Sequence, residues 1–256
     1  MTGTDIPQTV RIERTRHENV RRRQLTVTEK TMLTPHMIRL VLSGDELHDF
    51  TSLAPDDHVK LFFAGATGGP DGKPAMRDYT PRRWSTEART LTLDFAVHEA
   101  GPATAWAIAA EPGDSVEIGG PRGSQRVVGA TSLLLIGDET ALPAMGRWVE
   151  DLPDGFEVTT LGAVPGPADE QSWQSKANHR AFWTHRPVDQ ADAPGPLMDL
   201  LTAAPPRPDT FVWIAAEASV ARGLRTWLLD SHGHPLTMMK ARGYWTRGMA
   251  DTTESF

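Results

Sequence analysis

The stretch SLLLIGDETALPAMGRWVEDL, residues 132–152, decides the fold. Its first five residues, Ser132–Ile136, form a compact apolar run, which is typical of a strand buried on both faces of a parallel sheet. The run leads directly into GDETALPAMGRWVEDL, where early acidic residues and apolar residues at helical spacing predict a helix. A buried strand that passes at once into a helix is the repeating unit of an α/β domain.

The chain downstream repeats this alternation. Apolar runs predict further strands at Phe156–Leu161, Ala181–Thr184 and Phe211–Ala215. Helical patterns fill Pro196–Ala203 and Ser219–Asp230. Strands that alternate with helices indicate an open α/β domain with a parallel sheet.

The chain upstream has a different pattern, with short runs of β-branched and apolar residues between turn formers. The predicted strands are Leu25–Val27, Met37–Leu42, His58–Phe63, Leu91–Ala96 and Ser115–Ile118. Pro102–Ala110 is the exception, because its alanines and opening proline predict a short helix. We therefore expect an α+β protein of two domains, an antiparallel β-barrel over residues 1–128 and an α/β domain over residues 129–256, with the boundary near Val128–Thr131.

Composition excludes several classes of protein. The 256 residues include no cysteine, which removes disulfides, thiolate metal sites and iron–sulfur clusters. No apolar run is long enough to span a bilayer, and the first ten residues lack the apolar segment of a signal peptide, so we expect a cytoplasmic protein. The net charge of −7 disfavours nucleic-acid binding. The arginine-rich segment Arg11–Arg23 is interpreted as a hydrated strand and loop, with a basic rim for an anionic ligand as the alternative.

The sequence MRDYTPRRW, residues 76–84, carries the first candidate site. We expect Arg77, Tyr79 and Thr80 to lie on one face of a strand, where they present a guanidinium, an aromatic ring and a hydroxyl together. The guanidinium suits a phosphate, and the ring can lie against a planar cofactor. An exposed strand with a cross-strand aromatic pair is the structural alternative.

The start of the predicted helix at Pro102 is the second candidate site. Helix N-termini carry free amide groups and a partial positive charge. Gly101, Ala103 and Thr104 could therefore hold a pyrophosphate, and Thr104 adds a hydroxyl. A capped helix packed on the barrel is the alternative.

Histidine offers no metal site. None of the nine histidines forms an HExxH motif. His232 and His234 flank a glycine in a turn-like stretch, and we expect no protein-bound metal there.

Short motifs in a fixed order extend over almost the whole chain. They are LTPHMIRLVLSGDEL (33–47), DDHVKLFF (56–63), RDYTPRRW (77–84), DFAVHEAGPATAWA (94–107), PGDSVEIGGPRGS (112–124), GDETALPA (137–144), FVWIAAEAS (211–219) and GYWTRG (243–248). With them, the chain resembles the siderophore-interacting protein family, a branch of the ferredoxin reductase-like flavoproteins that reduce ferric siderophores. Two departures are Ala216, where a glycine is common, and the loop 162–171, which follows no recognisable pattern.

This resemblance implies FAD as cofactor and NADH or NADPH as electron donor. It implies that Arg77 binds an FAD phosphate, Tyr79 stacks on the flavin and Thr80 lies near its reactive edge. The remaining implied cofactor-binding residues are Ala96, Val97 and His98 beside the isoalloxazine, Gly101, Ala103 and Thr104 on the pyrophosphate, Gly137, Asp138, Glu139 and Thr140 in the turn after the first parallel strand, and Glu217 and Ser219 at the nicotinamide end.

The resemblance also implies a basic substrate side, because a ferric siderophore is bulky and often anionic. The candidates are Lys60 and Arg247, with Lys240 and Arg242 as weaker ones from the same C-terminal segment. Tyr244 and Trp245 are further candidates for packing near the flavin.

The implied reaction is reduction of a ferric siderophore by NAD(P)H through FAD, which releases Fe(II) and needs no catalytic acid, base or nucleophile. Two alternatives stay open: a flavin reductase that serves another acceptor, and a non-catalytic siderophore-binding protein. The sequence leaves the choice of NADH or NADPH, the siderophore class and the oligomeric state undecided, although nothing in it demands more than a monomer. Lys176, His179 and Arg180 are nearby candidates for the choice of nicotinamide.

Overall fold

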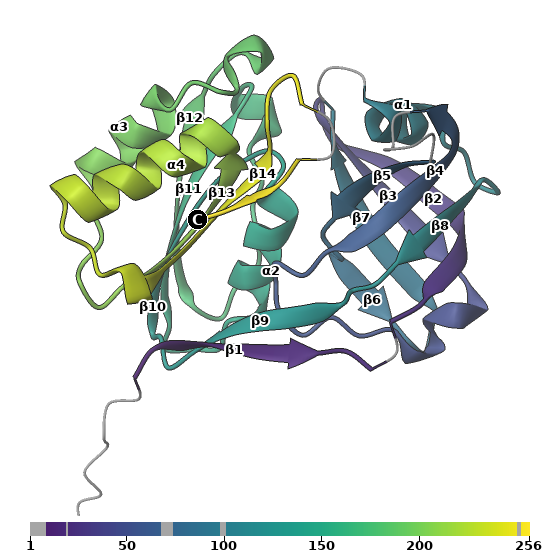
Figure 1. Cartoon of the computed structure of the whole chain (residues 1–256), viewed down its shortest axis with the longest axis horizontal. Coiled ribbons are helices and arrows are strands. Elements are labelled where there is room, and N and C mark those ends of the chain that lie inside the picture. The colour runs from purple at the N-terminus through teal and green to yellow at the C-terminus, as the bar shows by residue number, and fades with distance from the viewer. Residues whose placement is uncertain (1–8, 19, 68–73, 98–100, 250–251) are drawn as a thin grey trace, which may run out of the picture.

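Two large sheets follow one another along the chain. The computed structural model describes residues 9–18, 20–67, 74–97, 101–249 and 252–256, and Figure 1 shows their arrangement. A curled antiparallel sheet lies on one side of the molecule, and an α/β layer structure lies on the other.

The first large sheet has seven strands in the order β5-β4-β8-β2-β3-β7-β6, and every described pair is antiparallel. Alternating residues point into its core, as Ile38, Leu40 and Leu42 do along β3. The sheet curls so that Tyr79 of β5 packs on Phe95 of β7, with ring centroids 4.2 Å apart. This confirms the predicted antiparallel fold, although the described strands form no closed ring of hydrogen bonds. The strands are β2 (Arg22–Thr34), β3 (Met37–Ser43), β4 (Val59–Thr67), β5 (Pro74–Tyr79), β6 (Arg83–Ser85), β7 (Thr90–Ala96) and β8 (Ser115–Gly119).

Helix α1 (Pro102–Ala109) covers one end of this curled sheet, within one residue of the predicted bounds. Ala103 and Ala107 enter the core, and Trp106 packs on Phe95. The Nζ of Lys30 donates to the carbonyls of Ile108 and Ala110, so the end of the helix is satisfied. A short 3-10 helix, Asp45–Asp49, follows β3.

A separate two-stranded ribbon joins the two sides of the molecule. Strand β1 (Arg11–Arg16) pairs with β9 (Gly123–Val128), and the ribbon runs along the bottom of Figure 1 beneath both halves. The arginines of β1 are exposed, as expected for Arg11–Arg23. Arg23 departs from that expectation, because its side chain is only 2% exposed and pairs with Asp49.

The second large sheet has the order β12-β11-β10-β13-β14-β15, in which the first five strands are parallel. Its central strand is the predicted run. Leu133 and Leu135 face α2, whereas Leu134 and Ile136 face α3 and α4. The prediction of a strand buried on both faces is therefore confirmed. The strands are β10 (Ser132–Asp138), β11 (Glu157–Val164), β12 (Asn178–His185), β13 (Phe211–Glu217), β14 (Met239–Trp245) and β15 (Glu254–Ser255), and the helices are α2 (Leu142–Asp151), α3 (Gly195–Ala203) and α4 (Ala218–Thr226).

Several element bounds differ from the predictions. The helix predicted from Gly137 begins only at Leu142, because Gly137 and Asp138 complete β10. The helix predicted to reach Asp230 ends as an α-helix at Thr226 and continues as a π-helical turn over Trp227–Ser231. Short 3-10 turns occur at Pro167–Asp169, Val188–Gln190 and Leu236–Met238.

Buried polar contacts join the two halves. The guanidinium of Arg82, from the loop after β5, forms two hydrogen bonds of 2.7 and 2.8 Å with Glu150 of α2. Arg147 of α2 donates in return to the hydroxyl and carbonyl of Ser52. These contacts fix how the halves face each other. None of the described helices is long and apolar enough to cross a membrane.

Candidate functional site

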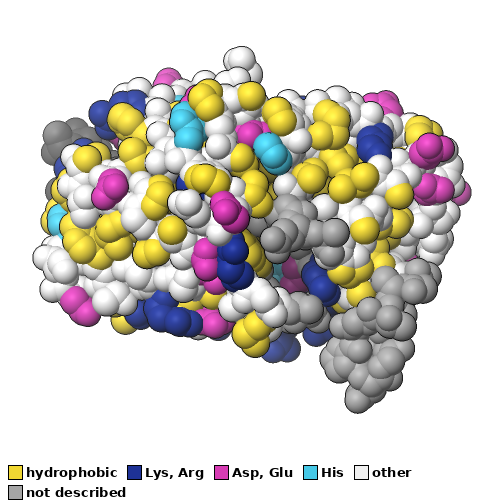
Figure 2. Space-filling model, turned by 90° about the horizontal axis from the view of Figure 1, so that it is seen from above, with side chains coloured by type: hydrophobic (Ala, Val, Ile, Leu, Met, Phe, Trp, Pro, Cys, Tyr) yellow, Lys and Arg dark blue, Asp and Glu magenta, His cyan; other side chains and the backbone are white. Residues whose placement is uncertain are grey.

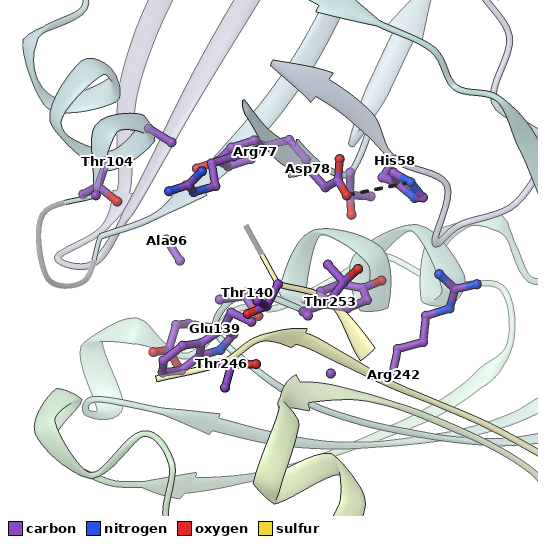
Figure 3. A pocket seen from close by; sticks show the side chains of 18 of the residues that line it. His58, Arg77, Asp78, Ala96, Thr104, Glu139, Thr140, Arg242, Thr246 and Thr253 are labelled. Atoms are coloured by element: carbon purple, nitrogen blue, oxygen red, sulfur yellow. Dashed lines mark ion pairs between the residues drawn. The ribbon is translucent and has the colours of Figure 1, made fainter. Parts of the chain in front are cut away.

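A cleft lies where the curled sheet meets the carboxyl edge of the parallel sheet. Figure 2 looks onto this side of the molecule, where acidic and basic side chains lie next to one another. The cavity measures about 620 Å³, within the range of about 300–1,000 Å³ that is usual for ligand sites. Figure 3 shows that one wall comes from the curled sheet and the other from the parallel sheet and the C-terminal segment.

Strand β5 supplies the first wall. Arg77, Tyr79 and Thr80 all line the cavity. Thr80 is one residue past the end of β5, so strand alternation does not explain its place, and the expected single strand face is corrected on this point. Arg77 donates to the carbonyl of Met76 and forms no ion pair with another described residue. Burial raises the pKa of Tyr79, which holds this hydroxyl neutral.

The N-terminus of α1 opens onto the same wall. Gly101, Ala103 and Thr104 line the cavity, and no side chain caps the helix. Pro102 occupies the first helical position and has no amide hydrogen. The amides of Ala103 and Thr104 therefore precede the first intrahelical bond, which Ala105 donates to Gly101. Together with Arg77, this wall offers the donors that a pyrophosphate requires.

The end of β7 contributes fewer cavity-lining residues than expected. Ala96 lines the cavity, whereas the backbone amide of Val97 donates to the carbonyl of His36. His98 lies outside the described residues.

The turn after β10 forms the facing wall, and two of its four predicted residues act behind the surface. A Cβ on Gly137 would come within 2.5 Å of the Ala141 Cβ and 2.9 Å of the Ala215 carbonyl, so glycine lets α2 start close to the sheet. Asp138 accepts hydrogen bonds from the backbone amides of Thr140 and Glu217, each within 2.9 Å. These two residues shape the turn, whereas Glu139 and Thr140 line the cavity.

Glu139 lines the cleft and also forms a buried ion pair. Its carboxylate lies 2.7 Å from the guanidinium of Arg186, and both side chains are less than 5% exposed. Burial raises the pKa of Glu139, the neighbouring Asp138 charge adds to this, and Arg186 opposes it. Another guanidinium nitrogen of Arg186 is buried without a partner among the described residues.

The predicted nicotinamide-end residues Glu217 and Ser219 are not brought to the cleft. The Glu217 carboxylate accepts from the amides of Ser219 and Val220 and thereby caps α4. Its other oxygen accepts from the amide of Arg247 at 3.3 Å. Both oxygens are thus engaged by the protein, which makes Glu217 a capping residue.

The predicted substrate-binding bases fall into two groups. Arg242 and Arg247 line the cleft. Lys240 is not among the lining residues: its ammonium is buried and lies 2.5 Å from Asp56. Burial lowers the pKa of Lys240 against the opposing charge of Asp56. Lys60 also lies behind the wall and pairs with Asp78 at 2.8 Å.

Sequence reasoning missed several cleft residues. Asp94 sits in the wall with its carboxylate held by Arg39 through two hydrogen bonds of 2.7 Å. The signal for it was available, because β3 and β7 place Arg39 and Asp94 directly opposite each other. The other missed lining residues are Asp56, His58, Asp78, Pro143, Val188, Ala191, Gly243, Thr246, Gly248, Met249, Thr252 and Thr253. Tyr244 and Trp245 line the cavity as well.

The cleft suits a ligand that carries phosphates at one end and a flat ring system at the other. Arg77 and the free amides of α1 provide for the phosphates, and Tyr79 and Thr80 line the same cleft. Within the described parts of the chain, no group of three or more His, Asp or Glu side chains is placed to hold a metal ion.

Family models match both halves of the chain. Residues 130–248 match the model described as siderophore-interacting protein. Residues 26–71 and 66–125 match the model of the siderophore-interacting FAD-binding domain. The NADPH-dependent ferric-chelate reductase of Escherichia coli (strain K12) is 30% identical over 257 residues, which cover 93% of this chain and 96% of the relative.

Solved structures agree with these family matches. A siderophore utilization protein from T. fusca has a TM-score of 0.84 and 32% identity, over 94% of this chain and 98% of its own. The ferredoxin reductase of carbazole 1,9a-dioxygenase has a TM-score of 0.66, over 86% of this chain and 66% of its own. At 15% identity it demonstrates the shared fold alone.

Proposed function

Because the chain belongs to the siderophore-interacting protein family, we propose that it is an FAD-dependent reductase. In this proposal it transfers electrons from NAD(P)H to a ferric siderophore and so releases Fe(II). The first 128 residues form the FAD-binding domain, and residues 129–256 form the NAD(P)H-binding domain and the substrate side.

One observation carries the proposal. The cleft brings the Arg77–Tyr79–Thr80 wall and the uncapped start of α1 opposite the turn that follows the central strand β10. That turn stands where the strand order reverses between β11 and β13, which is where open α/β sheets bind nucleotides. A phosphate- and ring-binding wall therefore faces a nucleotide-binding edge.

The residues of the first wall fit FAD. Arg77 and the Ala103 and Thr104 amides would hold the pyrophosphate, and the neutral hydroxyl and ring of Tyr79 would border the flavin. Thr80 would offer its hydroxyl, which no other described residue engages, to the reactive edge. When bound, FAD supplies two-electron uptake from a nicotinamide and one-electron delivery to Fe(III).

The second wall supports nicotinamide binding. Thr140 and Glu139 would face the dinucleotide, and Asp138 would hold the turn in place from behind. The chelate brings its own iron ligands, so the protein needs no metal ligand of its own. Hard oxygen donors bind Fe(II) more weakly than Fe(III), and reduction therefore releases the iron.

The test is a reconstitution with FAD followed by an anaerobic assay. The loaded protein should bleach when NADPH or NADH is added, and a ferric siderophore should then produce Fe(II), which a ferrous indicator traps. A protein that binds the chelate but takes up no FAD would be a carrier instead. A loaded protein that reduces quinones or soluble electron carriers but no ferric chelate would be a reductase for another acceptor.

A further inference from the structure

The charges around the cleft indicate which ferric chelate it accepts, and this inference rests on the proposed function. We propose that the acceptor is a ferric chelate of low net charge, of the neutral trihydroxamate class, in preference to a triply negative tris-catecholate.

Three of the bases that could attract an anionic chelate are each paired with an acidic side chain. Lys60 lies 2.8 Å from Asp78, and Lys240 lies 2.5 Å from Asp56. The Nε of Arg247 lies 3.1 Å from Asp192 of the segment that precedes α3. Each pair carries no net charge, and a neutral pair projects little field into a cleft.

One of these pairs is protected from solvent, and a second is partly buried. The Lys240 and Asp56 side chains are 8% and 3% exposed, and Trp213 donates a further hydrogen bond to the same carboxylate at 3.1 Å. A buried pair does not open readily for a ligand, since breaking it leaves one charge uncompensated. The Lys60 and Asp78 side chains are 34% and 23% exposed, and His58 lies 3.9 Å from the second Asp78 oxygen. Asp78 thus shields Lys60 and His58.

Among the described cleft residues, two guanidiniums remain without an acidic partner. Arg77 belongs to the wall that faces phosphates, beside the start of α1. Arg242 extends from β14 on the facing wall, toward the side where His58 and Asp78 lie. A single guanidinium is therefore left for the acceptor. It cannot balance three negative charges that lose their water on entering the cleft. A neutral chelate has no net charge whose hydration would be lost.

The test separates binding from redox chemistry. Gallium(III) has the charge and nearly the size of iron(III) but is not reduced, so its chelates report affinity alone. The dissociation constants of gallium(III) desferrioxamine E, which is neutral, and gallium(III) enterobactin, which is triply negative, are measured on the FAD-loaded protein by flavin fluorescence. We expect the neutral complex to bind at least about tenfold more tightly, equivalent to about 1.4 kcal/mol.

Two variants test the cause. Asp78→Asn frees Lys60 and His58, and should strengthen binding of the triply negative complex by about tenfold with little change for the neutral one. Asp209→Asn removes a surface acid that pairs with Arg207 outside the cleft and should change neither. FAD content is measured in each variant, since Asp78 adjoins Arg77.

The outcomes decide separate questions. The proposal is overturned if the triply negative complex binds as tightly as the neutral one, or if Asp78→Asn leaves the ratio unchanged. If neither gallium complex binds and the iron complexes are not reduced by the loaded protein, the proposed function itself fails.

Discussion

The carboxylate of Asp138, at the end of β10, accepts a hydrogen bond of 2.9 Å from the indole Nε1 of Trp245, at the end of β14. The same oxygen accepts from the Glu217 amide at the end of β13. One buried side chain therefore ties together three strand ends at the edge that we propose binds NAD(P)H.

Asp138→Ala removes these bonds and leaves buried donors unpaired. We expect the free energy of unfolding to fall by about 2–4 kcal/mol, because each unsatisfied buried group costs about 1–3 kcal/mol. NADPH should also bind more weakly, since the turn at Thr140 loses its anchor. Urea unfolding and a fluorescence titration with NADPH measure the two effects. Trp245→Phe, the comparison variant, removes the indole donor to Asp138 but keeps the carboxylate that holds Thr140 and Glu217, and the loss of that hydrogen bond should cost about 1 kcal/mol; equal costs for both variants would contradict this account.

Gly137→Ala tests the close approach of α2 to the sheet. The added methyl group would collide with the Ala215 carbonyl, which cannot move away within the sheet. Overpacking of this kind costs about 1–3 kcal/mol, and we expect that loss of stability by chemical denaturation. Gly166→Ala is the control, because a Cβ there meets nothing within 4 Å. Similar stability of the two variants would refute the packing role of Gly137.

Arg77→Met should weaken FAD binding. A charge-assisted hydrogen bond contributes about 1.5–3 kcal/mol, which corresponds to a factor of roughly 10 to 150 in Kd. Quenching of FAD fluorescence on binding to the apoprotein measures this constant. Arg14→Met removes an exposed arginine of β1 and should have no effect. If both variants bind FAD like the parent protein, Arg77 does not contact the cofactor.

The Arg82–Glu150 contact predicts how acid weakens the junction between the halves. Burial alone would raise the pKa of Glu150, but hydrogen bonding and the charge of Arg82, with help from Arg83, hold it below its ordinary value of 4.5. A carboxylate whose pKa is lowered in the folded state stabilises that state fully at pH values above its unfolded-state pKa. This contribution is lost as the pH falls through its folded-state pKa.

The difference in unfolding free energy between the parent and Glu150→Gln should therefore be constant from pH 7 down to about 5 and shrink below the ordinary pKa. Denaturant titrations at each pH measure it. A difference that grows on acidification would show that the Glu150 charge destabilises the junction.

The sequence predicts those elements whose apolar pattern or terminal residue is clear along the chain. The apolar run Ser132–Ile136 predicts β10 because both of its faces are buried, and Pro102 marks the start of α1. Strand β2 extends from Arg22 to Thr34, far beyond the predicted Leu25–Val27, because two register shifts disturb its alternation. Strand β14 was missed, since its second residue is a lysine that is buried next to its ion-pair partner Asp56.

The same limit applies to the site. Local motifs located Arg77, Thr80, Thr104 and Thr140, which all line the cleft. A local sequence motif does not reveal ion pairs between residues that are far apart in the chain. Lys60 and Lys240 therefore looked like free bases, and Asp94 escaped notice.

The central claim, electron transfer from NAD(P)H through FAD to a ferric chelate, is tested most directly by a single turnover. The FAD-loaded protein is reduced anaerobically with one equivalent of NADPH or NADH and mixed with excess ferric trihydroxamate, while absorbance follows flavin and ferrous indicator together. This account predicts that the oxidised flavin spectrum returns as two Fe(II) form per flavin, because FAD carries two electrons and each iron accepts one. A reduced flavin that stays bleached in the presence of the chelate, with no Fe(II) formed, would contradict it.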